Sequence, residues 1–488
     1  MEIDNKTRRK FLKNTTVLAL TSLANQSWIT REEANNAYQA MGTRVGEISS
    51  STAIVWARIT STPERNNKGI IIPGRAQNYK IDQLPEPNVI VEELEGACPG
   101  INGFVRLKYG TEESLKKGKV TPWVEVSEKT DFIHQFHLKN LDSFCTYFFE
   151  SETTTNKNKS NSIKFKGKFK TAPKPDVIAD IRFCLMTCQG YPDRGHIDGH
   201  SIYPSMLSLK PDFACLTGDL VYYDNDMPRA NNIRLARYHW ERMFSLPRLI
   251  EFNSNVGTYW LKDDHDTLDN DSEPGAKMGE FTFAQGQQIF RQQAPLNDGP
   301  SYRTFRWGKD LQIWLSEGRD FRSPNEMPDG PDKTIWGKEQ KEWFKKTVKE
   351  STATWKILVS PTPLVGPDRI QKDDNHSNIG FKHEGEELRN WLKNHVPDNF
   401  FVICGDRHWQ YHSVHPETGL NEFSIGAASD EHAGGTPGEN KNYHRFHLVK
   451  GGFMSVDVIR KGNTSSIEFS HHDTNGKIVY KWSEELKF

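Results

Sequence analysis

The chain has 488 residues, of which 35% are hydrophobic and 26% charged, and its formal net charge is −1. This composition is that of a soluble globular protein, and the length exceeds one small core, so two domains are the first expectation. The balanced charge gives no support for nucleic-acid-specific binding or for attachment to an anionic membrane. No run approaches the roughly 18 apolar residues of a membrane helix, so stable membrane insertion is not expected.

The N-terminus carries the pattern of an export signal. Residues 7–13 (TRRKFLK) resemble the twin-arginine signal, and a short, mildly apolar core follows at 17–23. Small residues at 22–24 (SLA) are a candidate cleavage site. We therefore expect residues 1–30 to be a signal segment for the twin-arginine export machinery, and the protein to be exported, periplasmic or extracellular. The alternative is a basic helix start at a cytoplasmic N-terminus.

Residues 46–171 have the texture of short strands separated by Gly, Pro and Asn, with no convincing helical period. The segment 132–150 resembles the last strands of a fibronectin-type sandwich. We expect a small all-β, fibronectin- or Ig-like domain over 40–172, ending in a stiff linker at 171–175 (TAPKP).

After the linker, apolar strands alternate with helical stretches. This alternation predicts an α/β fold (α+β layered), with a β-sandwich core flanked by helices, over 173–488. The tail from 453 to 482 returns to strands, with a hairpin turn at 475–476 (NG). The expected helices cover 233–244, 337–349 and 384–395.

The six cysteines do not form a disulfide framework. Cys184 and Cys188 fall in one predicted strand, which places their Cα atoms roughly 13 Å apart, beyond disulfide reach. Cys215 and Cys404 lie inside apolar strands and are expected to be core thiols. The pair 471–472 (HH), in the C-terminal strands, is expected at the surface.

The segment 260–271 (WLKDDHDTLDND) holds five aspartates directly after an apolar stretch. Carboxylates this close together repel one another. A solvated acidic loop is the simple interpretation. Because four similar clusters occur elsewhere in the chain, a second interpretation is favoured. In it, the loop faces multivalent cations that offset the repulsion.

Each of these polar clusters begins at or shortly after the predicted end of an apolar strand. The carboxyl ends of strands form the ligand-binding edge of layered α/β proteins, so the clusters are expected to meet in space. Asp, His, Tyr and Cys are capable metal ligands, and Arg binds oxyanions or phosphate. The clusters are 188–189 (CQ), 218–222 (GDLVY), 263–266 (DDHD), 319–322 (RDFR) and 405–408 (GDRH).

These motifs, in this order, resemble the alkaline phosphatase D (PhoD-like) family, a branch of the calcineurin-like metallophosphoesterases. The resemblance rests on 187–189 (TCQ), Gly-Asp-x-x-Tyr at 218–222, Asp-Asp-His-Asp at 263–266 and Gly-Asp-x-His at 405–408. It spans nearly the whole chain and implies a metallophosphoesterase fold with phosphate-ester hydrolysis. The substrate class it implies is a small-molecule or polymeric phosphate ester.

By this resemblance, Cys188, Asp219, Tyr222 and Asp406 are the expected ligands of a ferric ion (Fe3+). Such an ion is a hard acid that suits phenolate and carboxylate oxygen, and its charge lowers the pKa of a tyrosine or cysteine beside it.

The second expected site holds calcium (Ca2+), bridged by Asp219, with Asp264 and His408 as the other ligands. Asn270 is a further candidate ligand. The sequence departs from the family pattern on this side, because Tyr223 stands where an acid is usual and 269–271 read DND. The number and identity of these ions therefore stay open.

Two metals about 3.5–4 Å apart can clamp the attacking and leaving oxygens of an in-line displacement, with a metal-bound hydroxide attacking phosphorus. His265 would stabilise the phosphoryl oxygens or protonate the leaving group. Arg319 and Arg322 are candidates for a phosphate clamp, or else structural ion-pair partners. Residues 424–432 (SIGAASDEH) are candidates for lining the same pocket.

Two other functions stay open. One is a secreted binding protein for a glycan or a partner, stabilised by calcium and without turnover. The other keeps the fold but acts on phosphotriesters or sulfate esters. Substrate specificity is expected to depend on the loops at 274–300 and 361–382.

Overall fold

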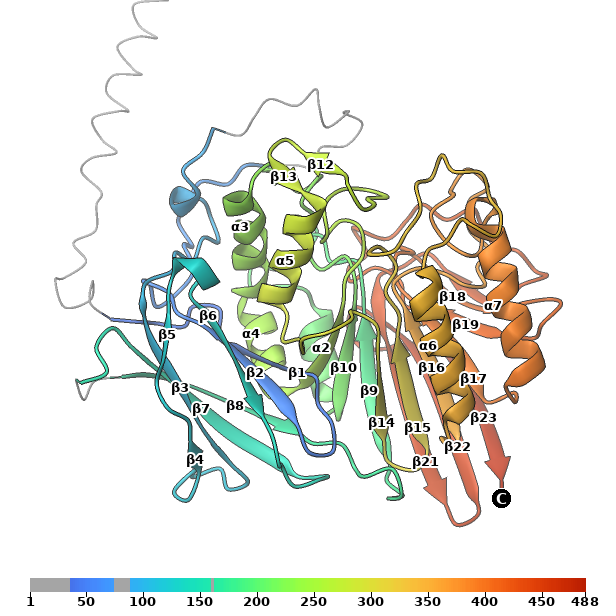
Figure 1. Cartoon of the computed structure of the whole chain (residues 1–488), viewed down its shortest axis with the longest axis horizontal. Coiled ribbons are helices and arrows are strands. Elements are labelled where there is room, and N and C mark those ends of the chain that lie inside the picture. Colours follow the sequence, from blue (N-terminus) through green and yellow to red (C-terminus); the bar gives the residue numbers. More distant parts are fainter. Residues whose placement is uncertain (1–35, 74–87, 159–161) are drawn as a thin grey trace, which may run out of the picture. The chain divides into compact units, whose positions relative to one another are not determined.

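The computed structural model of the chain describes residues 36–73, 88–158 and 162–488 (Figure 1). The predicted export signal, residues 1–30, lies outside the described residues. Within the described part, none of the helices is both long and apolar enough to cross a membrane.

The core is built on a nine-stranded sheet whose three central strands, β9, β10 and β11, run parallel. Both faces of these strands are buried, which explains their nearly continuous apolar sequences. In sheet order the strands are β23 (Ile478–Lys487), β22 (Thr464–Asp473), β21 (Gly452–Lys461), β9 (Ile181–Met186), β10 (Phe213–Thr217), β11 (Gly257–Leu261), β1 (Thr43–Gly46), β2 (Ala53–Arg58) and β6 (Ile133–Leu138).

A seven-stranded sheet packs against one face of the first, and β15, β16, β17 and β19 run parallel within it. Phe183 and Phe213 of the first sheet share one core cluster with Ile357 and Ile403 of the second. In sheet order its strands are β14 (Arg303–Trp307), β15 (Leu311–Leu315), β16 (Trp355–Ser360), β17 (Phe400–Cys404), β19 (Asn421–Ser424), β18 (Gln410–Val414) and β20 (His444–Leu448).

Helices cover the outer face of each sheet. The alternate residues Met186 and Leu216 of the first sheet pack on one helix group, and Leu358 and Val402 of the second sheet pack on the other. The first group is α2 (Ile202–Ser208), α3 (Ile233–Phe244), α4 (Pro247–Asn255) and α5 (Phe283–Gln293), and the second is α6 (Gly337–Glu350) and α7 (Lys382–His395). Figure 1 shows the two groups in green to yellow and in orange. The expected layered fold and its three predicted helices are confirmed.

The strands of the predicted N-terminal β domain are divided between two sheets. β1, β2 and β6 extend the nine-stranded sheet, where Gly46 pairs in parallel with Thr258 of β11. The others form a five-stranded sheet of β4 (Lys119–Val120), β3 (Gly103–Gly110), β7 (Thr146–Thr154) and β8 (Ile163–Lys170), with β5 (Val124–Val126) on β3.

Residues 37–488 cluster as one unit. A boundary at 172/173 and an Ig-like domain over 40–172 therefore stay predictions. The remaining short elements are the hairpin of β12 (Lys277–Met278) and β13 (Phe281–Thr282) and the 3-10 turns η4 (Val91–Glu93), η5 (Glu128–Thr130) and η6 (Ile379–Phe381).

One expectation about the C-terminal strands is wrong. His471 and His472 are buried rather than exposed, since both lie in β22 within the sheet. His471 Nε2 donates to the carbonyl oxygen of Ser424, 2.9 Å away, and burial lowers the pKa of His471 to about 3. The hairpin turn at 475–476 between β22 and β23 is confirmed.

Candidate metal centre

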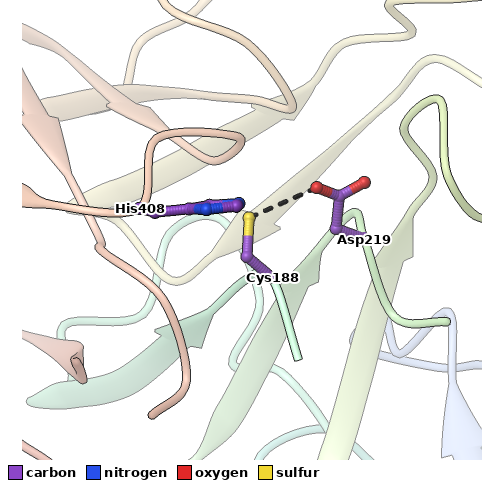
Figure 2. A group of neighbouring side chains, drawn as sticks. All are labelled: Cys188, Asp219 and His408. Atoms are coloured by element: carbon purple, nitrogen blue, oxygen red, sulfur yellow. Dashed lines mark hydrogen bonds between the residues drawn. The ribbon is translucent and has the colours of Figure 1, made fainter. Parts of the chain in front are cut away.

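Asp219 lies at the meeting point of the strand-end clusters. Three groups of potential ligands share Asp219. Within each group the donor atoms lie within 4.8 Å of one another. Figure 2 shows the first group, in which Cys188 and His408 approach Asp219 from different loops. The groups are Cys188, Asp219 and His408; Asp219, Asp264 and His265; and Asp219, Asp263 and Asp406.

The backbone at these strand ends is unusual. Cys188, Asp219 and Asp406 have φ values of 51°, 55° and 59°, in the left-handed region that costs a non-glycine residue roughly 1 kcal/mol or more. The glycine before each aspartate lets the loops approach closely. A Cβ on Gly218 would lie 2.8 Å from Cβ of Asp263, and one on Gly405 would lie 2.5 Å from the carbonyl oxygen of Thr217. The Gly-Asp pairs therefore place both carboxylates in one crowded pocket.

The carboxylates of this pocket repel one another. Asp219 is 1% exposed, and its burial together with Asp264 and Asp263 raises its pKa to about 8, although His265 opposes the shift. Burial and Asp264 likewise raise the pKa of Asp263 to about 6, against the effect of Arg319. Among the residues that the structure describes, Asp219 Oδ1 and Asp263 Oδ2 have no hydrogen-bond partner. Buried anionic oxygens in this state need an external positive charge, so the pocket fits a metal cation.

A thiol and a phenol complete the donor set beside Asp219. Cys188 Sγ lies 3.4 Å from Asp219 Oδ2, and the Tyr222 hydroxyl lies 3.2 Å from the same oxygen. Burial, and then Asp219, raise the pKa of Cys188 well above its ordinary value. A bound cation reverses this effect because it favours the thiolate. Sulfur, phenolic and carboxylate donors at one point fit a transition metal better than calcium alone.

The structure groups the other predicted ligands somewhat differently from the expectation. His408 lies with Cys188 and Asp219, on the side expected for iron. Asp264 lies in a second group, with Asp219 and His265, and Asp406 lies in a third, with Asp219 and Asp263. Asn270 is exposed on the turn after the acidic motif, where its backbone N–H donates to Asp224 Oδ2 at 3.2 Å.

His265 and Asp224 form a pair at the edge of this group. His265 Nδ1 lies 2.8 Å from Asp224 Oδ1, and its ring centroid lies 4.5 Å from that of Tyr222. Burial alone would lower the pKa of His265, but Asp224, Asp264 and Asp219 raise it well above the ordinary value. In the metal-free protein these carboxylates therefore favour the protonated, positively charged form of the His265 ring.

The two predicted arginines contact the acidic loop. Arg319 is fully buried, its Nε donates to Asp263 Oδ1 at 2.5 Å, and its Nη2 lies 3.6 Å from Asp264 Oδ2. Arg322 Nη1 donates to the carbonyl oxygen of Asp271 at 2.6 Å. The described contacts of both side chains hold the loop in place.

Two residues of this centre were missed in the sequence, and the contact of a third was not predicted. Asp263, the first aspartate of the acidic motif, faces Asp219 although the motif pointed to the second. Asp266 accepts hydrogen bonds from the backbone N–H groups of Asp263 (2.6 Å) and Leu220 (3.1 Å), and so ties the two loops together. His432 ends the segment expected to line the pocket, and its Nε2 lies 2.9 Å from the Tyr222 hydroxyl.

Comparisons with known proteins agree with this geometry. A model of the PhoD-like phosphatase family matches residues 183–451, more than half of the chain. Alkaline phosphatase D of Bacillus subtilis (strain 168) is 23% identical over 335 residues, which are 57% of this chain and 54% of that protein. The chain thus aligns with about half the length of that relative.

Two solved structures share the fold. The structure of PhoD superposes with a TM-score of 0.69 at 17% identity, over 92% of this chain and 90% of that one. Purple acid phosphatase PPD1 from yellow lupin (Lupinus luteus) seeds superposes with a TM-score of 0.60 at 13% identity, over 92% and 74%.

Proposed function

Because the chain belongs to the PhoD-like phosphatase family, we propose that it is a metal-dependent phosphoric ester hydrolase acting on phosphomonoesters, phosphodiesters or both. The observation that carries the proposal is the convergence of three ligand groups on Asp219. The substrate is a small-molecule or polymeric phosphate ester.

The proposed metals are ferric iron and calcium. Cys188, Tyr222, Asp219 and Asp406 would hold the ferric ion, with His408 on the same side. When bound, the metals would supply a nucleophile from water at neutral pH and neutralise charge on the phosphoryl oxygens.

The second ion would be held by the oxygens of Asp264 and Asp219, which suit calcium. The proposed ligand set leaves out Asn270, because that residue is exposed.

The protein's own groups prepare the rest of the reaction. Asp224 holds His265 through Nδ1, so that Nε2 is left to donate a proton to the leaving oxygen or to a phosphoryl oxygen. Arg319 is proposed to compensate Asp263 and Asp264 rather than to clamp phosphate, because its nearest charged groups are those two carboxylates.

We further propose export through the twin-arginine machinery to the periplasm or the cell exterior, on the strength of the motif at 7–13. The Ig- or fibronectin-like character of residues 40–172 is proposed on the strand pattern alone.

The test combines elemental analysis of the exported protein with a panel of aryl phosphate, bis-aryl phosphate and aryl sulfate. We expect iron and calcium, release of phosphate, and at least about a 10²- to 10³-fold loss of rate in a folded Asp219→Asn variant. Full activity in that variant would show that Asp219 is not the bridging ligand. Calcium alone, with no ester turned over, would favour a binding protein instead.

A further inference from the structure

A chain of three side chains leads from a peripheral loop to the metal centre. Asp193 Oδ2 lies 2.8 Å from Nδ1 of His432, and Nε2 of the same ring lies 2.9 Å from the Tyr222 hydroxyl. That hydroxyl in turn lies 3.2 Å from Asp219 Oδ2. Asp193, His432 and Tyr222 are far apart in the sequence, so only the folded molecule aligns them.

The chemistry of the three groups sets the direction of the hydrogen bonds. An ionised Asp193 can only accept, so His432 Nδ1 carries a hydrogen and donates to it. In the neutral ring Nε2 then accepts, and the Tyr222 hydroxyl donates to it. The same hydroxyl is also within reach to donate to Asp219 Oδ2, at 3.2 Å, so that His432 and Asp219 are its two acceptors. The two contacts together fix the position of the Tyr222 oxygen beside Asp219 in the metal centre.

The loop that carries His432 is fixed to the centre at both ends. The backbone N–H of Ala428 donates to the carbonyl oxygen of Cys188 at 3.2 Å, and that of Gly434 donates to the carbonyl oxygen of His408 at 3.0 Å. The His432 ring centroid lies 4.3 Å from that of His408, and the His432 side chain is 2% exposed. The ring is therefore held rigidly between two predicted ligands.

We propose that Asp193 and His432 are a positioning pair that orients Tyr222 as a metal ligand. The inference rests on the proposed function only in taking Tyr222 to bind ferric iron. Groups that hydrogen-bond to metal ligands set their orientation and basicity, and their loss commonly lowers metal affinity about 10- to 100-fold. A purely structural histidine at this place would leave the Tyr222–iron bond unchanged.

The test uses the visible charge-transfer absorption of a tyrosinate–ferric bond, measured on the whole protein loaded with ferric iron alone. His432→Asn places a polar atom near Nδ1 and loses the contact with Tyr222. His432→Gln places a polar atom near Nε2 and keeps that contact. Asp193→Asn keeps the shape but can donate to Nδ1, so that Nε2–H would face Tyr222.

The matched control is a second histidine–tyrosine pair outside the three ligand groups. His412 Nδ1 lies 2.9 Å from the Tyr480 hydroxyl, in strands β18 and β23. His412→Asn makes the same change of side chain there. Thermal unfolding of all the variants selects those that are folded.

We expect His432→Asn and Asp193→Asn to shift the absorption band and His432→Asn to weaken iron binding about 10- to 100-fold. His432→Gln and His412→Asn should stay close to the unchanged protein. The proposal would be overturned if His432→Asn had the same absorption band and the same iron affinity as His412→Asn. It would also be overturned if the iron-loaded protein showed no tyrosinate–ferric band. A protein with the band that hydrolyses no ester would refute the proposed function and leave this inference standing.

Discussion

Two of the clusters in which the described residues bury charge are balanced in opposite ways. Around Arg58, where β2 meets α3, every carboxylate oxygen has a partner. Arg58 Nη2 lies 3.2 Å from both Asp131 Oδ1 and Glu241 Oε1. Gln293 Nε2 donates to the other oxygen of Asp131 at 2.8 Å. The backbone N–H of Cys98 donates to the other oxygen of Glu241 at 2.9 Å.

Around Asp219 the carboxylates face one another instead. Arg319 pairs with Asp263 and Asp264, and the backbone N–H groups of the loop donate to Asp264. One oxygen of Asp219 and one of Asp263 have no hydrogen-bond partner among the described residues. The first arrangement balances its charge within the chain, which is what folding requires. The second balances only when cations are bound. Satisfied oxygens thus identify a structural cluster, and unsatisfied ones identify a site.

The largest effect expected on the site side of this comparison comes from His265. Replacing it with Asn removes the proposed proton donor and should lower the rate of phosphate release about 10²- to 10⁴-fold. Iron and calcium content, measured by elemental analysis, should not change. A parallel loss of metal would instead make His265 a ligand, because its ring lies in the same group as Asp219 and Asp264.

The structural cluster predicts a large effect of another kind. Arg58→Met leaves Asp131 and Glu241 with less counter-charge in a buried place, so the free energy of unfolding should fall by about 3–5 kcal/mol. Urea unfolding measures this loss. Metal content and rate per folded molecule should remain those of the unchanged protein, and a loss of metal would erase the distinction between the two clusters.

A smaller change in the free energy of unfolding, on the order of a few kcal/mol, is expected when the pH of the metal-free protein is raised. The folded-state pKa values of Asp219 (about 8), Asp269 (about 7) and Asp263 (about 6) lie above the ordinary aspartate value, chiefly through burial. Folding therefore favours their protonated forms, and this stability is lost as the pH rises from about 4 to about 8. The pKa of His265 is also raised, so its contribution to stability is likewise lost as the pH rises above the ordinary histidine pKa.

Thermal unfolding of chelator-treated protein across this pH range checks the prediction. The unfolding temperature should fall with rising pH, less so in Asp219→Asn, and the fall should disappear on reloading with metal. A metal-free protein that becomes more stable towards pH 8 would contradict the assigned repulsion.

The smallest effect belongs to an exposed pair on the five-stranded sheet. Lys164 Nζ lies 2.8 Å from Glu150 Oε1 with half of its side chain in solvent. Lys164→Met should change the free energy of unfolding by less than about 1 kcal/mol in urea. A loss comparable to that of Arg58→Met would show that burial does not decide the value of an ion pair here.

Much of the fold could be predicted because its core strands are apolar and its helices periodic. The position of Cys188, Asp219 and Asp406 at the ends of apolar strands also predicted from the sequence that they lie near one another. The same reasoning could not place β1, because the pairing of Gly46 with Thr258 joins positions that no local pattern connects.

The site was predicted less completely than the fold. His432 meets Tyr222 across 210 residues, and Asp263 was hidden by its neighbour in the same motif. His471 was placed at the surface because its burial depends on the packing of β22, which its neighbours in the sequence do not reveal.

The ligand-bearing strand ends come from two different sheets, with Asp219 after β10 and Asp406 after β17. A cation held by both carboxylates would cross-link the two sheets of the sandwich. Its binding free energy adds directly to the resistance of the folded protein against separation of the layers. Metal supply would then govern how long each molecule survives as well as how fast it works.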